Sequence, residues 1–183
     1  MKLELESHST HDGSPFALRS PVPDDAAVML VFLRQLLHES SEHLNAPSSG
    51  YDGVDIGSHV ATLERMLAAD RSFYLSAFDG DAMVGNLVFS PIDIPVSQHC
   101  GQLGMGVLAT HQGRGVASAL LSRCIAEASK LGVWNIRFTV RTYNQRAISL
   151  YERHGFRRVG RLERVAKIGD AHVDEFMYQG VFE

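Results

Sequence analysis

The most constraining stretch of this chain is LGMGVLATHQGRGVASALL, residues 103–121, in which a glycine-rich loop joins an apolar strand pattern to a helical one. Gly113 and Gly115 lie one residue apart, directly before the helical pattern begins. Glycine adopts backbone conformations that other residues avoid and lets another group come close to the main chain. The first-turn amides of a helix have no partner within the helix, and the helix dipole favours an anion there. The stretch therefore predicts a strand–loop–helix unit that can hold anionic oxygens.

Two widespread phosphate-binding loops do not match this stretch. A nucleoside-triphosphate loop needs Lys-Ser or Lys-Thr after its last glycine, whereas this chain has Val116 and Ala117 there. The dinucleotide fingerprint needs three spaced glycines in a parallel βαβ unit near the start of a domain, whereas this loop follows a hairpin pattern in mid-chain. A generic phosphoanion-binding domain with a nucleotide ligand stays open as an alternative.

Composition limits the class of protein. The 183 residues, 45% hydrophobic and 21% charged, fit one compact domain, and the net charge of -4 gives no global field that would attract nucleic acid or anionic lipid. No apolar run reaches the roughly 18 residues of a membrane span, and the N-terminus lacks a signal-peptide core. Cys100 and Cys124 have no metal-type spacing, which favours two thiols in a reducing compartment, with one disulfide as the alternative. We therefore expect a soluble cytoplasmic protein that binds no metal, nucleic acid or membrane.

The pass along the chain predicts a polar, flexible tail over residues 1–14 and a single domain over residues 15–183. Helical patterns follow Asp24 and Ser58, which we expect to be capping residues, and Asp79-Gly80 marks a hairpin turn. The expected order of elements is β-α-α-β-β-β-α-β-α-β-β. This order predicts an α/β (α+β) fold with a mixed, mostly antiparallel central sheet of about six to seven strands flanked by helices on both faces.

Two segments resemble the motifs of one known family. Gln112, Gly115 and Ala117 form a Gln-x-x-Gly-x-Ala pattern after a strand, which resembles the loop signature of the GNAT superfamily of N-acetyltransferases. The segment RTYNQRAISLYERHGFRRVG resembles the family's later motif, Asn-x-x-Ala-x-x-Leu-Tyr-x-x-x-Gly-Phe. Its matching residues are Asn144, Ala147, Leu150, Tyr151, Gly155 and Phe156. The resemblance covers roughly residues 16–181, is strongest over residues 103–160, and implies the GNAT-like fold.

The resemblance implies that acetyl-CoA is the acyl donor, a cosubstrate whose pyrophosphate lies on main-chain groups of the glycine loop. It also implies that the preceding strand parts from its neighbour and pairs with the pantetheine arm through residues 105–108, where Gly104 and Gly106 suit a close approach. The donor-binding residues that we expect are Met105, Val107, Leu108, Gln112, Gly113, Arg114, Gly115, Val116, Ala117, Asn144, Ala147 and Tyr151.

The catalytic residues that we expect are Tyr151, Val107 and His99. In the family, a tyrosine at the position of Tyr151 protonates the leaving thiolate; the alternative is a tyrosine that only packs in the core. The N–H of Val107 would stabilise the oxyanion. Many family members carry a glutamate base on this strand, but the present strand has no carboxylate, and His99 shares parity with Val107 along it. Weaker candidates for the base are Asp93, Glu39 and Asp174, and an acyl-Cys100 is disfavoured.

The region between the first two helices is acidic and aromatic, which suits a cationic acceptor, although such charges usually only face solvent. Its residues are His38, Glu39, Glu42, His43, Tyr51, Asp52 and Asp55. We therefore expect an N-acetyltransferase that moves an acetyl group to a small-molecule or peptide amine by direct attack in a ternary complex. The alternative is a non-catalytic coenzyme A-binding sensor. Exposed edge strands also make a homodimer an expectation.

Overall fold

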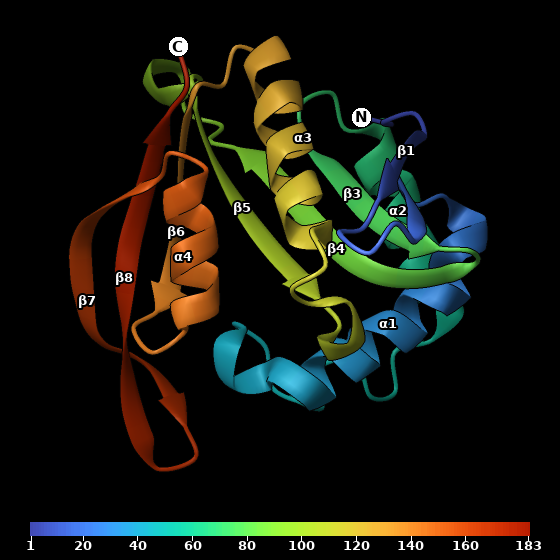
Figure 1. The fold of residues 1–183 in the computed structure, drawn as a ribbon, viewed down its shortest axis with the longest axis horizontal. Coiled ribbons are helices and arrows are strands. Elements are labelled where there is room, and N and C mark those ends of the chain that lie inside the picture. Colours follow the sequence, from blue (N-terminus) through green and yellow to red (C-terminus); the bar gives the residue numbers. More distant parts are fainter. The chain divides into compact units, whose positions relative to one another are not determined.

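The computed structural model describes residues 1–183 and contains four α-helices and eight strands (Figure 1). The helices are α1 (Ala26–Ser40), α2 (Ile56–Ala68), α3 (Val116–Lys130) and α4 (Gln145–Arg153). The strands are β1 (Glu6–Ser9), β2 (Pro15–Arg19), β3 (Phe73–Asp79), β4 (Ala82–Pro91), β5 (Cys100–Val107), β6 (Asn135–Arg141), β7 (Arg157–Ile168) and β8 (Ala171–Val181). None of the helices combines the length and the apolar composition that crossing a bilayer would need.

The strands form one open sheet in the order β1-β2-β3-β4-β5-β6-β8-β7. β1–β2, β2–β3, β3–β4, β6–β8 and β7–β8 pair antiparallel, whereas β5 and β6 pair parallel. The predicted mixed, mostly antiparallel sheet is thus confirmed. The sheet has eight strands rather than about six to seven, because the N-terminal segment adds one.

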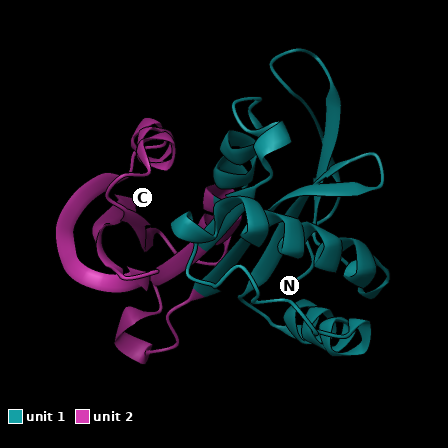
Figure 2. Ribbon diagram, turned by 90° about the horizontal axis from the view of Figure 1, so that it is seen from below, with its two compact units in different colours: residues 1–90, 104–124 teal, residues 91–103, 125–183 magenta.

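By its internal contacts the chain divides into two compact units (Figure 2). Unit 1 comprises residues 1–90 and 104–124, and unit 2 comprises residues 91–103 and 125–183. Unit 1 therefore contains the glycine loop and the first turns of α3. Unit 2 contains α4 with Tyr151, and also His99. The strand β5 begins in unit 2 and ends in unit 1.

The extra strand β1 lies within residues 1–14, where the sequence predicts a flexible tail. It pairs antiparallel with β2 from Glu6 opposite Leu18 to Ser9 opposite Pro15. Leu3 is only 5% exposed, and its backbone N–H donates to the Ser20 hydroxyl oxygen at 2.9 Å. Polar composition misled here, because an edge strand needs main-chain pairing and few buried side chains, while its polar side chains face water.

In unit 1, α1 and α2 pack with strand residues in one apolar cluster that includes Phe32, Leu63 and Phe78. The caps differ from those expected at Asp24 and Ser58. Asp25 occupies the N-cap position of α1, and the Asp55 carboxylate accepts a hydrogen bond from the Ser58 N–H at the start of α2. In both helices the cap is an aspartate next to the expected residue or three positions before it.

Unit 2 has an aromatic core between α4 and the strands β6 and β8. The Phe138 ring centroid lies 4.2 Å from that of Tyr151, 5.0 Å from that of Phe156 and 6.2 Å from that of Tyr178. Alternation along β6 places Ile136, Phe138 and Val140 on one face, so α4 covers a predominantly apolar strip. The Tyr151 ring is thereby packed among the aromatic side chains of this core.

Candidate functional site

The glycine loop joins β5 to α3 within unit 1. Its first residue, Gln112, donates from its side-chain Nε2 to the carbonyl oxygen of Val107 at 2.9 Å, which ties the loop to the end of β5. Gly113 and Gly115 have φ values of 76° and 97°. Residues other than glycine are strained at such angles, so the turn into the helix requires both glycines whatever the loop binds.

The space beside the two glycines differs. A Cβ atom built on Gly113 meets nothing within 4 Å, so the loop is open to an approaching group there. A Cβ built on Gly115 would lie 3.1 Å from the His11 Nε2 atom. The sequence predicts open backbone at both glycines, whereas the structure has the His11 ring beside Gly115.

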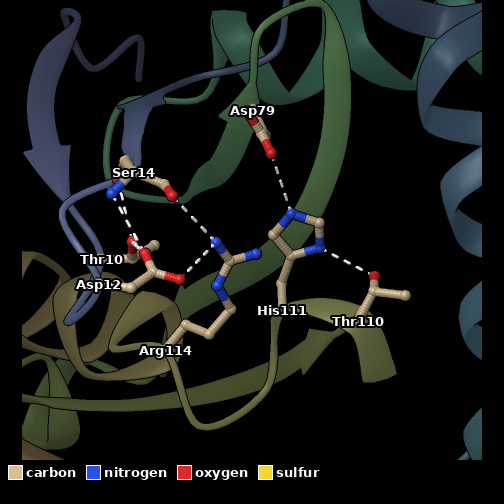
Figure 3. Close-up of polar contacts among 7 residues, drawn as sticks. All are labelled: Thr10, Asp12, Ser14, Asp79, Thr110, His111 and Arg114. Carbon is tan, nitrogen blue, oxygen red and sulfur yellow. Dashed lines mark hydrogen bonds and ion pairs between the residues drawn. The ribbon is translucent and has the colours of Figure 1, made fainter.

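His11 belongs to the turn between β1 and β2, residues 10–14, which lies against the glycine loop (Figure 3). The His11 N–H donates to the Arg114 carbonyl oxygen at 3.1 Å. The Arg114 guanidinium donates to the Asp12 carboxylate at 3.0 Å and to the Ser14 hydroxyl at 3.2 Å. The other Asp12 carboxylate oxygen accepts hydrogen bonds from the Thr10 hydroxyl and the Ser14 N–H. These bonds, that from Thr10 above all, lower the pKa of Asp12 and keep it ionised opposite Arg114.

A histidine side chain flanks the loop from the other end. The His111 ring contacts the Asp79 carboxylate through Nε2 at 3.2 Å and the Thr110 hydroxyl through Nδ1 at 2.9 Å (Figure 3). Arg114 and His111 therefore each face a carboxylate of unit 1. Any anion that binds the loop has to compete with Asp12 and Asp79 for these two groups.

The strand before the loop pairs with β6 over only part of its length. β5 pairs with β6 from Cys100 opposite Asn135 to Gln102 opposite Arg137, and then continues to Val107. A Cβ built on Gly106 would lie 2.5 Å from the Leu36 side chain of α1, so this glycine permits the close approach of α1. Nothing lies within 4 Å of a Cβ built on Gly104. The stretch expected to bind pantetheine, residues 105–108, follows the end of the pairing with β6.

The structure does not bring His99 to Val107. His99 precedes the first residue of β5, where its ring stacks on Trp134 with centroids 4.5 Å apart. Val107 is the last residue of the strand, and eight residues of extended chain span roughly 26 Å. Equal parity along a strand means only that two side chains share a face of the sheet. His99 lies at the opposite end of β5 from Val107.

The alternative carboxylates are held differently. Asp174 accepts hydrogen bonds from the Arg164 N–H at 2.8 Å and from the Arg161 guanidinium, which together lower its pKa and make it a poor base. Glu39, near the end of α1, accepts a hydrogen bond from the Ala109 N–H at 3.0 Å. Glu39 is thus the carboxylate that lies beside the end of β5.

The second motif forms α4 and the residue before it. The Asn144 side-chain oxygen accepts a hydrogen bond from the Ala147 N–H at 3.2 Å, so Asn144 caps the helix. Tyr151 is 7% exposed, and burial raises the pKa of its phenol to about 12. The phenol is therefore protonated at neutral pH, as a proton donor must be, while its ring contributes to the aromatic core.

Sequence reasoning missed the contacts of the turn at residues 10–14 and left Glu39 among several candidates. Asp12 lies 102 positions from Arg114, and Glu39 lies 70 positions from Ala109. No local pattern encodes such contacts. The sequence showed that Asp12 and Glu39 are acidic, but it did not show that they lie beside the glycine loop.

The chain is similar to known acetyltransferases. Residues 33–156 match the family model described as Acetyltransferase (GNAT) family. The chain is 32% identical over 111 residues to the N-alpha-acetyltransferase RimI of Mycobacterium tuberculosis, a match that covers 61% of this chain and 68% of that protein. Across the curated relatives that it matches, the chain spans 31% to 68% of their lengths.

Solved structures agree with the observed fold. The GNAT-family acetyltransferase of Streptococcus pneumoniae has a TM-score of 0.85 and 25% identity, covering 92% of this chain and 99% of that one. The structure of yncA from Salmonella typhimurium with its cofactor acetyl-CoA has a TM-score of 0.79 and 18% identity, covering 92% of this chain and 94% of that one. Because the family model covers most of the chain, including the glycine loop and all of α4, this protein belongs to the GNAT family of acetyltransferases.

Proposed function

We propose that the protein is an N-acetyltransferase that transfers the acetyl group of acetyl-CoA directly to a primary amine. The observation that carries the proposal is the strand–loop–helix unit of unit 1, in which Gly113 has open space beside it and leads into the first turn of α3. Free amides at a helix start bind phosphate oxygens, and the family match supports acetyl-CoA as their source.

In this proposal the loop and the strand before it bind the donor. The main chain of residues 112–117 holds the diphosphate, with Arg114 at the rim. Residues 105–108 pair with the pantetheine arm, and this is supported by the end of the β5–β6 pairing at Gln102. The Val107 N–H stabilises the oxyanion that forms on the thioester carbonyl.

The resemblance of the second motif assigns two further roles. Asn144 and Ala147 contact the donor, and Tyr151 donates its proton to the leaving sulfur. Its raised pKa means that the phenol begins the reaction protonated. In this proposal the buried Tyr151 hydroxyl first donates a strong hydrogen bond to the leaving thiolate and then transfers its proton to the sulfur.

The proposed reaction conserves atoms and charge. The acceptor ammonium first loses one proton to solvent, and the nitrogen lone pair then forms a bond to the thioester carbon. The resulting oxyanion re-forms the carbonyl while the C–S bond breaks and the thiolate leaves. Tyr151 gives its proton to the sulfur, and the nitrogen of the new amide returns one proton to the phenolate. The products are the acetylated amine and free coenzyme A.

Turnover over a defined amine panel tests the proposal. The panel contains a peptide with a free α-amino group, as the name of the mycobacterial relative suggests, a free L-amino acid, and an N-terminally blocked peptide with one lysine. We expect mass spectrometry to detect one added acetyl group on at least one of them. Calorimetric binding of acetyl-CoA without any acetylation would favour a coenzyme A sensor. Displacement of acetyl-CoA by ATP would favour a nucleotide-binding domain.

A matched pair of glycine variants tests the position of the donor site. Gly113 and Gly132 both have positive φ values, 76° and 73°, and neither has an atom within 4 Å of a built Cβ. Gly113→Ala and Gly132→Ala therefore introduce the same backbone strain, but only Gly113→Ala fills the proposed approach to the loop. We expect the affinity for acetyl-CoA to fall about tenfold or more in Gly113→Ala alone. Equal affinities in the two variants would contradict this placement.

A further inference from the structure

The strand that would carry the thioester lacks an acidic residue of its own. β5 reads CGQLGMGV, with no carboxylate from Cys100 to Val107. An amine acceptor is a cation at neutral pH, and it needs a negatively charged or hydrogen-bond-accepting partner to be held beside the thioester. The partner must therefore come from another element.

Helix α1 brings a carboxylate to this place. Leu36 and Glu39 lie three residues apart on α1, so they lie on the same face of the helix. Leu36 packs against the backbone of Gly106, and Glu39 accepts the hydrogen bond from Ala109 at 3.0 Å. Two independent contacts thus place this face of α1 against the end of β5.

Glu39 retains the capacity to bind a cation. One carboxylate oxygen faces Ala109, and the other accepts a hydrogen bond from the Gln35 side chain at 2.8 Å. A carboxylate has about four lone-pair positions, so two contacts leave room for the donors of an ammonium group. The side chain is exposed and reachable from solvent, and Glu39 forms no ion pair in the structure.

The neighbouring cation on α1 does not neutralise Glu39. The Arg34 guanidinium donates to the carbonyl oxygens of Tyr51 at 3.1 Å and Val54 at 3.0 Å, in the segment between α1 and α2. Glu42, which follows α1, is also exposed. Arg34 therefore does not compensate the negative charge of Glu39, and that charge favours the approach of a cation.

We propose that Glu39 binds the ammonium group of the acceptor and holds it at the end of β5. The inference rests on the proposed N-acetyltransferase function and deepens it, because it selects cationic primary amines as the acceptor class. Glu39 thereby replaces, from α1, the carboxylate that β5 lacks. The ammonium loses its proton to solvent from this position, and the neutral nitrogen attacks the thioester.

Glu39→Gln tests the charge without removing the hydrogen-bond acceptor. Its side-chain oxygen still accepts from Ala109, so α1 stays in contact with the loop. With the amine that the wild-type protein acetylates best in the panel above, we expect KM for the amine to rise about 10- to 100-fold. We expect kcat, the affinity for acetyl-CoA and the melting temperature to stay close to the wild-type values.

Glu42→Gln is the matched control, since it removes one exposed negative charge close to the same end of α1. An equal rise of KM in both variants would show a general field effect and overturn the role of Glu39. An unchanged KM in Glu39→Gln, with a lowered melting temperature in Glu39→Ala, would overturn it too, because Glu39 would then only anchor Ala109. If the wild-type protein acetylates no amine, the proposed function itself fails, and that result is distinct from either outcome.

Discussion

Tyr151 combines a proposed chemical role with a packing role, and one atom separates them. Tyr151→Phe removes the phenolic oxygen and keeps the ring that lies 4.2 Å from Phe138. If the hydroxyl protonates the leaving thiolate, kcat should fall about 100-fold while the affinity for acetyl-CoA stays the same. Steady-state kinetics and calorimetry measure the two quantities. Fold stability should change little, because the ring contacts remain.

Tyr178→Phe is the control for this prediction, since Tyr178 belongs to the same aromatic cluster and its hydroxyl donates to Glu152 at 2.9 Å. It also loses one phenolic oxygen. A similar small change of kcat in both variants would mean that Tyr151 is a core aromatic and that another group protonates the sulfur.

If the glycine loop binds the diphosphate as proposed, Asp12 should oppose that binding, because its own negative charge already pairs with the Arg114 guanidinium. In Asp12→Asn the side-chain oxygen can still accept from Thr10 and Ser14, but the charge is lost. We expect the affinity for acetyl-CoA to rise about threefold, since an exposed pair is weak and Arg114 becomes free for the diphosphate. Titration calorimetry at low salt measures this gain.

The same substitution in an Arg114→Gln background should have a smaller effect, because the two residues act through each other. Asp170→Asn, in another turn where the carboxylate faces Lys167 at 3.8 Å, is the control for lost charge alone. A weaker affinity in Asp12→Asn would mean that Asp12 orients Arg114 for the donor instead of competing with it.

At the scale of elements, the N-terminal segment that contains β1 was not predicted to be structured, and its contribution to the free energy of unfolding can be measured. Leu3 is 5% exposed and Leu5 is 61% exposed, so the two leucines form a matched pair. Leu3→Ala should lower the free energy of unfolding by about 2–3 kcal/mol, and Leu5→Ala by less than about 0.5 kcal/mol. Urea unfolding followed by circular dichroism gives both values. Equal small effects would mean that the segment behaves as a tail in solution.

Sequence periodicity predicted the elements in which buried positions carry apolar side chains and exposed positions carry polar ones. The helix from Val116 and the helix before Gly155 follow from apolar residues at helical spacing, and both are found as α3 and α4. β1 has little such periodicity, because none of its four residues is buried and it is held by main-chain pairing with β2. Pairing between main chains carries almost no signal in the side chains.

The candidate site divides in the same way. The unusual backbone conformation at Gly113 and Gly115 was predictable, because glycine is the residue type that adopts positive φ without strain. The position of His99 was not, because face parity along a strand contains no information about distance from its end. The contact of Glu39 with Ala109 depends on how α1 lies against β5, which tertiary packing decides.

At the scale of the whole molecule, the two units share β5, which pairs with β6 through residues 100–102 and continues to Val107 in unit 1. If either unit unfolds, β5 loses part of its structure, and this disturbs the hydrogen bonds that β5 makes in the other unit. We therefore expect residues 15–183, together with the strand β1 that pairs with β2, to unfold as one cooperative domain in spite of the two compact units. Two native side chains, Trp134 in unit 2 and Cys124 in unit 1, allow the unfolding of each unit to be followed separately.

Trp134, the only tryptophan, lies in unit 2, and the buried thiol of Cys124 lies at the end of unit 1. The Cys124 side chain is fully buried, and burial also raises the pKa of its thiol, so a thiol reagent should modify it only on unfolding. In Cys100→Ser, which leaves Cys124 as the single thiol, labelling and Trp134 fluorescence should show the same urea midpoint. Labelling of Cys124 at clearly lower urea than the change in Trp134 fluorescence would mean that unit 1 opens first. β5 would then be a hinge between two folding units, and a donor site built on the end of that strand would open with unit 1.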